Sequence, residues 1–348
     1  MMTRTRLTTL GVGIALGAMA MTLTPGVLLA QPARLPAQAA SRLPAQAASR
    51  IVVDSNAERG GPEAVVFDGT NLWVVLQFGN QVVQMVGLQR APAAVQTVAV
   101  GRAVTVGNRP VAAAFDGENI WVANLFSDTV TKIQARTAAI LGTFKAGAGP
   151  GGVLFDGQNI WIANRHSDTI TKLQATDGAT LGTFAVGRRP IAMAFDGANI
   201  WVTNNFSNTV TKLRASDGVT LGTFKVGDGP FGVDFDGANI WVANFFDGTV
   251  TKLQASDGTP LGTFDVGDGA TGVKFDGIDV LVTANGENTV TKLRVQDGAI
   301  LEKLDVGDGP FHLALAGVNF WTADFSANTV STTTNVKVVA PRPLPPLP

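Results

Sequence analysis

The sequence predicts an all-β fold, a seven-bladed β-propeller whose blades are four-stranded antiparallel sheets. Three observations support this: a phrase close to FDGANIWVAN returns every 40 residues, each unit holds four short apolar or alternating runs, and Gly or Asp-Gly separates the runs. A period of this length suits either a helical solenoid or a propeller. Because no run is long enough for a helix and Val, Ile, Thr, Phe and Trp dominate the runs, we expect strands.

The repeat has seven copies, with one step of 48 residues after the first copy and steps of 40 elsewhere. The first residue of the phrase is Phe67, Phe115, Phe155, Phe195, Phe235, Phe275 or Leu315. Trp stands six positions later in every copy except the sixth, which has Leu281. Seven copies predict seven blades, with the Trp ring filling the gap between adjacent blades.

The fourth copy illustrates the expected strands of one blade. They cover Ile191–Phe195, Asn199–Thr203, Thr209–Leu213 and Thr220–Val226. The pairs Asp196-Gly197 and Asp217-Gly218 fall between the first and second strands and between the third and fourth. Tight hairpins need residues that tolerate positive φ, and Asp-Gly supplies them.

The ring of blades must close, because an open array would expose an apolar blade face and a strand edge. The last copy lacks an outer strand like the LGTF.VG of the third to fifth copies. We expect the segment Ile51–Val53 to supply this strand, with Val336–Val339 as the alternative.

Residues 1–30 have the pattern of a signal peptide, because Arg4 and Arg6 precede an uncharged stretch that ends at Ala30. An uncleaved transmembrane anchor is the alternative, disfavoured by the Gly, Thr and Pro residues in the stretch. We expect cleavage after Ala30 or at Ala37-Gln38-Ala39, and no stable transmembrane span afterwards. Residues 31–50, with the octapeptide RLPAQAAS twice, predict a disordered linker, residues 51–340 the propeller, and residues 341–348 a Pro-rich tail.

Composition excludes several kinds of site. The chain has no Cys, which removes disulfides, thiolate metal ligands and cysteine nucleophiles. The formal net charge is −1, which is unfavourable for a phosphate-binding surface, so we do not expect nucleic acid as the main partner.

Positions that recur in every copy are expected to serve the fold. The recurring Asp of the FDG phrase is interpreted as a hairpin residue, and the recurring Asn of WVAN as a turn hydrogen-bonding residue. Lys132, Lys172, Lys212, Lys252 and Lys292 stand 40 residues apart on the expected third strands. We interpret these lysines as a solvated face of the rim.

A distinct site must use positions that differ between copies. These positions cluster in two sets of loops, the connections into each inner strand and those between the second and third strands, which we expect on one face of the disk. The ligand-binding residues expected at this face are Phe126, Arg165, His166, Phe206, Phe246 and Asp324. Basic residues belong to copies two to four and acidic residues to copies five to seven, which could orient a dipolar ligand or a protein partner.

The inner strands should line the channel, where most residues are small. His312 replaces the Ala or Gly of the other copies. Asp234 and Lys274 share a position on neighbouring blades, so they can form an ion pair, and we expect both among the ligand-binding residues. For catalysis the best candidate group is His312 with Asp324 and Glu63, which could bind Mg²⁺ or Ca²⁺ if the side chains converge. Nucleophilic catalysis lacks candidates.

The units, with Trp201-Val202-Thr203-Asn204 and Thr209-Val210-Thr211-Lys212 in the fourth copy, resemble the YVTN/YncE-like β-propellers of bacterial envelopes. This resemblance implies an exported binding or scaffolding protein, and one YncE-type member is associated with DNA. A more distant resemblance is to the seven-bladed streptogramin B lyases, which use His and Glu with Mg²⁺. His312 and Asp324 are the nearest counterparts here, but Asp replaces the Glu and a second channel His is missing.

Taken together, these features predict a periplasmic or secreted monomer that is more a binding module than an enzyme and needs no cofactor. Its expected partner at the channel face is a protein, an envelope glycan or a small molecule. A metal-assisted lyase or hydrolase is the first alternative, and YncE-like DNA binding is the second.

Overall fold

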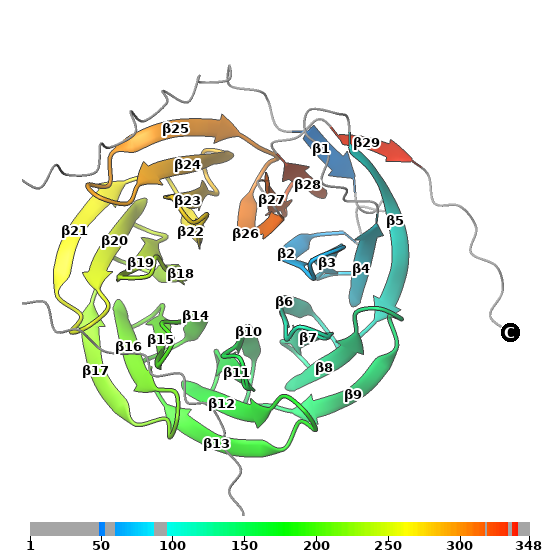
Figure 1. Cartoon of the computed structure of the whole chain (residues 1–348), viewed down its shortest axis with the longest axis horizontal. Coiled ribbons are helices and arrows are strands. Elements are labelled where there is room, and N and C mark those ends of the chain that lie inside the picture. The colour runs from blue at the N-terminus through cyan, green and yellow to red at the C-terminus, as the bar shows by residue number, and fades with distance from the viewer. Residues whose placement is uncertain (1–48, 53–59, 87–95, 317–318, 333–335, 340–348) are drawn as a thin grey trace, which may run out of the picture. The chain divides into compact units, whose positions relative to one another are not determined.

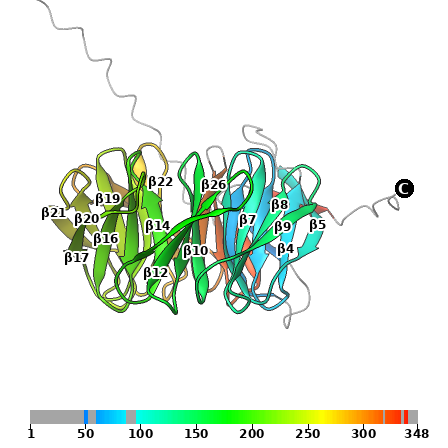
Figure 2. The ribbon, with the colours of Figure 1, turned by 90° about the horizontal axis from the view of Figure 1, so that it is seen from below.

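The computed structural model describes residues 49–52, 60–86, 96–316, 319–332 and 336–339. These residues form seven β-sheets arranged as blades around a central axis, so the all-β, seven-bladed prediction is confirmed (Figure 1). Seen from the side, the strands run between two faces on which the connecting loops lie (Figure 2). The predicted signal peptide, most of the linker and the Pro-rich tail lie outside the described residues.

Each blade is built from consecutive strands that pair antiparallel, from the channel outwards. Blade 1 contains β2 (Pro62–Phe67), β3 (Leu72–Leu76), β4 (Gln81–Val86) and β5 (Gln96–Thr105). Blade 2 contains β6 (Pro110–Phe115), β7 (Asn119–Asn124), β8 (Thr129–Gln134) and β9 (Ile140–Lys145). Blade 3 contains β10 (Pro150–Phe155), β11 (Asn159–Asn164), β12 (Thr169–Gln174) and β13 (Thr180–Ala185). Blade 4 contains β14 (Pro190–Phe195), β15 (Asn199–Asn204), β16 (Thr209–Arg214) and β17 (Thr220–Lys225).

The remaining blades continue this order around the ring. Blade 5 contains β18 (Pro230–Phe235), β19 (Asn239–Asn244), β20 (Thr249–Gln254) and β21 (Pro260–Asp265). Blade 6 contains β22 (Ala270–Phe275), β23 (Asp279–Ala284), β24 (Thr289–Arg294) and β25 (Ile300–Asp305). Blade 7 contains β26 (Pro310–Ala316), β27 (Asn319–Asp324) and β28 (Thr329–Thr332), and it is completed by β1 (Ser49–Val52).

Blade 7 is closed by the N-terminal strand, as the sequence predicted. Strand β1 pairs antiparallel with β28, and Ile51 lies opposite Val330. The alternative closing strand, β29 (Val336–Val339), has a different place: it pairs parallel with β5 as a fifth, outermost strand of blade 1. Both chain segments therefore act at the junction of blades 7 and 1.

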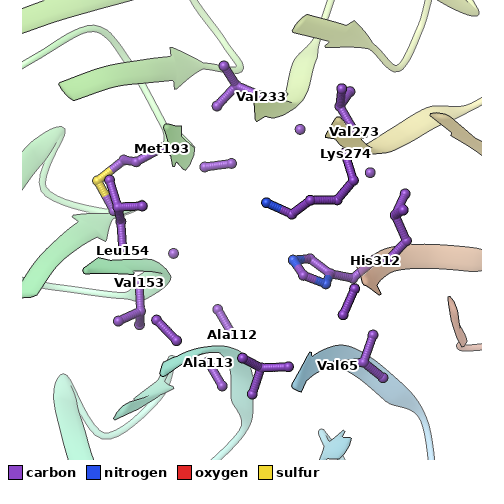
Figure 3. A pocket seen from close by; sticks show the side chains of 18 of the residues that line it. Val65, Ala112, Ala113, Val153, Leu154, Met193, Val233, Val273, Lys274 and His312 are labelled. Carbon is purple, nitrogen blue, oxygen red and sulfur yellow. The ribbon is translucent and has the colours of Figure 1, made fainter. Parts of the chain in front are cut away.

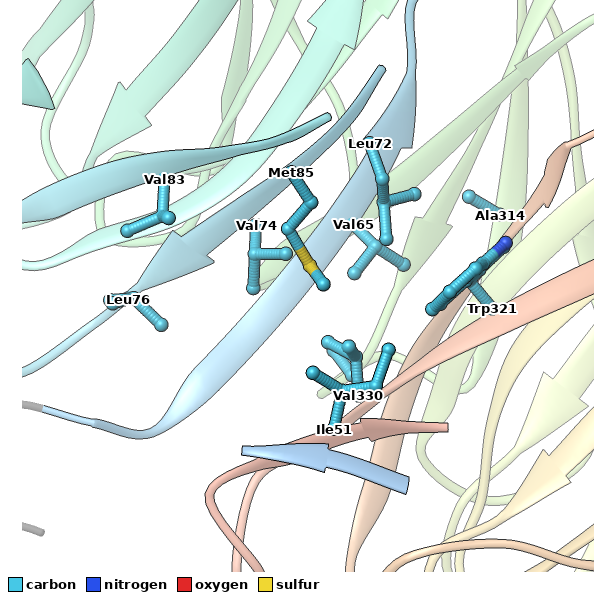
Figure 4. Close-up of a cluster of buried hydrophobic side chains, with 11 residues drawn as sticks. Ile51, Val65, Leu72, Val74, Leu76, Val83, Met85, Ala314, Trp321 and Val330 are labelled. Atoms are coloured by element: carbon cyan, nitrogen blue, oxygen red, sulfur yellow. The ribbon is translucent and has the colours of Figure 1, made fainter. Parts of the chain in front are cut away.

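The hydrophobic core is divided into clusters, most of which join two adjacent blades. The cluster between blades 7 and 1 contains Ile51 of β1, Val65, Leu72 and Met85 of blade 1, and Trp321 of blade 7 (Figure 4). Neither face of a single blade could be buried without its neighbour, which explains why the blades stack. All six Trp side chains are fully buried in these contacts, as expected.

The recurring Asp is the hairpin residue that the sequence predicted, and it has a second role. In blade 4, Asp196 Oδ1 accepts hydrogen bonds from the backbone N–H groups of Ala198 and Asn199. Its Oδ2 accepts a hydrogen bond from Trp201 Nε1 at 2.8 Å. The carboxylate thus fixes the turn and orients the Trp ring against the next blade.

The interpretation of the recurring lysines as a solvated face is wrong. Lys132, Lys172, Lys212 and Lys252 are buried. In blade 4, Lys212 Nζ lies 4.9 Å from the centre of the Trp201 ring and donates to the carbonyl of Ala255 in blade 5 at 2.7 Å. The ammonium group therefore links blades through a cation–π contact and backbone carbonyls. Blade 6 lacks the Trp, and Lys292 there pairs with Asp276 and Asp279 of its own blade.

The described residues include no helix with the length and apolar character needed to span a membrane.

Candidate functional site

A central cavity of about 550 Å³ follows the axis of the propeller. Its wall is formed by the inner strands of all seven blades, β2, β6, β10, β14, β18, β22 and β26. Most of the wall is apolar, and the charged or titratable residues on it are few. They are Glu63, Arg165, Asp234, Lys274 and His312. The volume is within the range typical of small-molecule sites.

The two sets of variable loops meet at one face of the disk, as expected, and we call this face the channel mouth. In blade 2 the backbone N–H groups of Leu125 and Phe126 donate to the carbonyls of Arg109 and Asn108. The same pair of bonds in blade 3 joins Arg165 and His166 to the loop that enters β10. Backbone bonds therefore hold each loop against its neighbour and fix the positions of the side chains on them.

The inner strands are irregular where they leave the mouth. In blade 7 the register with β27 shifts between Pro310 and His312, so that Phe311 has no residue opposite it. Glu63 in blade 1 and Phe231 in blade 5 lie at the corresponding shifts. A β-bulge redirects a side chain. In this propeller the bulges contribute Glu63, Phe231 and Phe311 to the lining of the cavity.

The ion pair predicted on the channel wall is present. Lys274 Nζ lies 3.3 Å from Asp234 Oδ1, and the other carboxylate oxygen of Asp234 accepts a hydrogen bond from the backbone N–H of Phe275. The pair thus joins β18 to β22. Lys274 and His312 both extend into the channel from neighbouring blades (Figure 3).

His312 is held in the neutral state by its surroundings. Burial and the ammonium group of Lys274 lower the pKa of His312 to about 4, and a hydrogen bond to the backbone of Val65 acts the other way. Its Nδ1 atom has no hydrogen-bond partner among the described residues. A neutral imidazole can accept a hydrogen bond from a ligand, but it cannot act as a cation near pH 7.

The candidate catalytic group does not assemble around His312. Asp324 is fully buried inside blade 7, where its carboxylate accepts hydrogen bonds from the hydroxyls of Thr322, Thr329 and Ser331. It takes the position of the recurring Asn and is absent from the channel lining. No group of three His, Asp or Glu side chains in the described part of the chain could hold a metal ion.

Glu63 lines the channel near the basic side of the mouth. Burial raises the pKa of Glu63, and the guanidinium groups of Arg165 and Arg109 oppose that change. Its Oε2 accepts a weak hydrogen bond from Gln77 Nε2 at 3.4 Å. Glu63 therefore belongs to the electrostatics of the mouth and not to a site with Asp324.

Six phenylalanines form a continuous series of ring contacts at the mouth, which we call the aromatic arc. In order of contact they are Phe78, Phe325, Phe311, Phe231, Phe245 and Phe246. Adjacent ring centroids lie 5.3 to 6.3 Å apart. Phe78 is 53% exposed and Phe246 is 65% exposed, so the arc offers apolar surface to solvent. Exposed apolar surface of this kind is typical of a binding site.

The other side of the mouth, on blades 2 to 4, carries four arginines, which we call the arginine cluster: Arg109, Arg165, Arg188 and Arg189. The predicted ligand-binding residues Phe126 and Phe206 support this cluster. The guanidinium of Arg109 lies 4.7 Å from the centre of the Phe126 ring, and that of Arg189 lies 4.4 Å from the centre of the Phe206 ring. His166 is exposed beside them and lines a second pocket of about 300 Å³ with Arg165 and Arg189.

Part of this mouth was not predicted. Phe78, Phe231, Phe245 and Phe311 were not predicted as ligand-binding residues, although the last three stand at positions that differ between copies and Phe78 stands at the position of Phe126, Phe206 and Phe246. The available signal was this difference between copies. What could not be foreseen is the register shift that places Phe231 and Phe311 in contact across blade 6.

Comparison with known proteins supports the fold. No protein-family model matches the chain, and no curated protein matches its sequence. A structure of streptogramin B lyase is 14% identical, with a TM-score of 0.68 over 82% of this chain and 97% of that chain. A catalytically inactive virginiamycin B lyase from Staphylococcus aureus with quinupristin is 16% identical, with a TM-score of 0.69 over 82% and 98%. A chain of Kuenenia stuttgartiensis hydrazine synthase is 18% identical, with a TM-score of 0.67 over 79% and 96%. At these identities the likeness establishes the seven-bladed fold and leaves activity open.

Proposed function

We propose that this protein is an exported, non-catalytic binding module that holds a small molecule or a glycan end of the cell envelope at the channel mouth. The observation that carries the proposal is the aromatic arc, a row of partly exposed rings beside a cavity of about 550 Å³. Ligand sites combine concave apolar surface with a few fixed polar groups, and the mouth has both. Export is supported by the pattern of residues 1–30 and the resemblance to envelope propellers, and the N-terminal residue of the mature protein would test it.

The polar groups of the channel favour binding over catalysis. Asp234 and Lys274 neutralise each other, and His312 has no carboxylate among its interacting groups that would orient or activate it. For the alternative, a metal-assisted lyase or hydrolase, two of the three candidates, His312 and Glu63, line the channel. Stoichiometric Mg²⁺ or Ca²⁺ binding that is lost in His312→Ala would favour that alternative.

The neutral fluorescent probe N-phenyl-1-naphthylamine tests the mouth directly, because its fluorescence rises in apolar surroundings. We expect it to bind the intact protein and to bind at least about tenfold more weakly to Phe311→Ala, since Phe311 is the ring that joins the two halves of the arc. Ile278→Ala is the matched control: Ile278 is an exposed apolar residue in the hairpin at the other end of the strands. Equal affinity of Phe311→Ala and the intact protein would contradict the proposal.

A further inference from the structure

Arg109 and Arg189 occupy a backbone position that normally requires glycine. Their φ angles are 54° and 53°, in the left-handed region. The other five blades have Gly at the same place, each with positive φ: Gly61, Gly149, Gly229, Gly269 and Gly309. A residue with a Cβ atom in this conformation costs about 1 kcal/mol or more. The turn itself does not explain why Arg replaces Gly in these two blades.

The turn is built identically with and without the arginines. The backbone N–H of Arg189 donates to Asp168 Oδ1 of blade 3 at 2.8 Å, and that of Arg109 donates to Asn80 Oδ1 of blade 1 at the same distance. Gly149 makes the equivalent bond to Asp128 Oδ1, also at 2.8 Å. The loop thus makes the same backbone hydrogen bond to the preceding blade with either Arg or Gly. The arginine side chains are therefore not needed to form the turn.

Both side chains lie close enough to Arg165 for their charges to act on it, and each packs on a Phe ring. The rings of Phe126 and Phe206 lie against their guanidinium groups and limit their movement. Blade 3 lies between the two and contributes Arg165, whose Nη2 donates to the carbonyl of Gly151 at 3.0 Å. Arg165 lines both the central cavity and the pocket of about 300 Å³ that Arg189 also lines.

The positive charge of the arginine cluster is only partly offset within the described part of the protein, where the carboxylate of Glu63 acts on Arg165 and Arg109. The ion pairs found there involve Arg214, Lys274, Lys292, Arg294 and Lys303, and none involves the arginine cluster. The Nε atoms of Arg109 and Arg165 are buried and have no hydrogen-bond partner among the residues that the structure describes. Burial, together with the charges of Arg189 and Arg109, lowers the pKa of Arg165 to about 10, and the carboxylate of Glu63 acts the other way. Unpaired buried donors and close like charges are both unfavourable, and a bound anion would relieve both.

We propose that Arg109, Arg165 and Arg189 bind the oxyanion of the ligand, a carboxylate, sulfonate or phosphate group, while its apolar part lies on the aromatic arc. The inference rests on the proposed function and adds the charge and shape of the ligand. Guanidinium groups present planar pairs of donors that match the oxygens of such groups. Asp168 also lines the smaller pocket, and its Oδ1 accepts a hydrogen bond from the backbone N–H of Arg189.

Two probes with the same aromatic skeleton test this inference. 8-Anilino-1-naphthalenesulfonate carries a sulfonate, and N-phenyl-1-naphthylamine lacks it. We expect Arg165→Gln and Arg189→Gln to weaken binding of the sulfonate at least about tenfold and to change binding of the neutral probe less than about twofold. Arg214→Gln is the matched control, because Arg214 is exposed at the end of β16. Inorganic phosphate should displace the sulfonate and leave the neutral probe bound.

The outcomes separate the two proposals. If the arginine variants bind the sulfonate as tightly as the intact protein does, the anion site is wrong, whether or not Phe311→Ala still weakens the neutral probe. If they weaken both probes equally, the effect is not specific to the charge and the inference is also wrong. Arg189→Gly provides a variant with the residue that five other blades use at this turn, so a loss of sulfonate binding with an unchanged midpoint of thermal unfolding is due to the missing side chain.

Discussion

The interior of the blades repeats the same contacts from blade to blade, whereas the channel mouth has different residues in each blade. In blades 2 to 5 the contacts of Asp, Trp and Lys are almost the same from blade to blade: Trp Nε1 to Asp Oδ2 is 2.7 or 2.8 Å in each. At the mouth, the bulge position of the inner strand holds Glu63 in one blade, Gly151 in another and Phe311 in a third. Repeated residues give blades 2 to 5 equivalent contacts, and the residues that differ between blades line the mouth, where we propose that the ligand binds.

The largest expected effect belongs to the repeated part. Trp201→Ala removes a fully buried ring, its hydrogen bond to Asp196 and the surface against which Lys212 packs. We expect a loss of about 3–5 kcal/mol in the free energy of unfolding, measured by denaturant titration, and less than about 1 kcal/mol for Phe311→Ala at the mouth. Similar losses in the free energy of unfolding for both variants would show that the mouth contributes as much to stability as the interior of the blades.

A smaller effect on stability is expected from pH. His312 in the channel and the repeated aspartates in the blades should act in different pH ranges. Because the pKa of His312 is lowered to about 4 in the folded protein, the unfolded chain binds more protons between about pH 6.5 and 4. Stability should therefore be complete above about pH 6.5 and fall by about 1–3 kcal/mol as the pH decreases to 4. Thermal unfolding across this range should show a flatter profile in His312→Gln.

The repeated aspartates respond at lower pH. Burial acts to raise the pKa of Asp196, but hydrogen bonds from Asn199, Trp201 and the backbone outweigh it and lower that pKa. Their contribution is present above the ordinary Asp value of about 4 and is lost as the pH falls further. If His312→Gln instead changed the profile only below pH 4, the assignment of the upper range to the channel would be wrong.

The smallest expected change in stability comes from Arg189→Gly. Removing the Cβ atom from a left-handed position relieves about 1 kcal/mol, and the lost contact with Phe206 and the added freedom of the unfolded chain each cost a similar or smaller amount. We expect the midpoint of thermal unfolding to stay within about 3 °C of that of the intact protein. A large decrease would mean that Arg189 serves the fold, which would also weaken the case for an anion site.

The sequence was sufficient for the fold because period and turn chemistry determine it. The closing strand at Ile51 and the pair of Asp234 with Lys274 followed from counting positions around a ring. The lysines were misjudged because a charged residue on an outer strand is usually solvated, whereas here the stem of Lys212 crosses a Trp ring to reach the next blade. Whether the ammonium group can reach a carbonyl of the next blade depends on the distance between the blades, which cannot be derived from the sequence.

The candidate site was predictable only in outline. Comparison of the copies predicted that the variable loops share one face, and the structure brings these loops together, with Phe126, Arg165 and Phe206 on them. Asp324 was assigned to that face although it stands where four other blades have a buried Asn, and alignment of the copies contained that information. The aromatic arc depends on the bulges of β18 and β26, and their effect on side-chain direction has no simple sequence signal.

The chain enters and leaves the propeller at its outer rim, since β1 is the outermost strand of blade 7 and β29 the outermost strand of blade 1 (Figure 1). A tether attached before β1 or after β29 would therefore hold the disk by its edge. The channel mouth would stay accessible while the protein was anchored, so fusion of a surface anchor or a reporter to either end should be compatible with ligand capture.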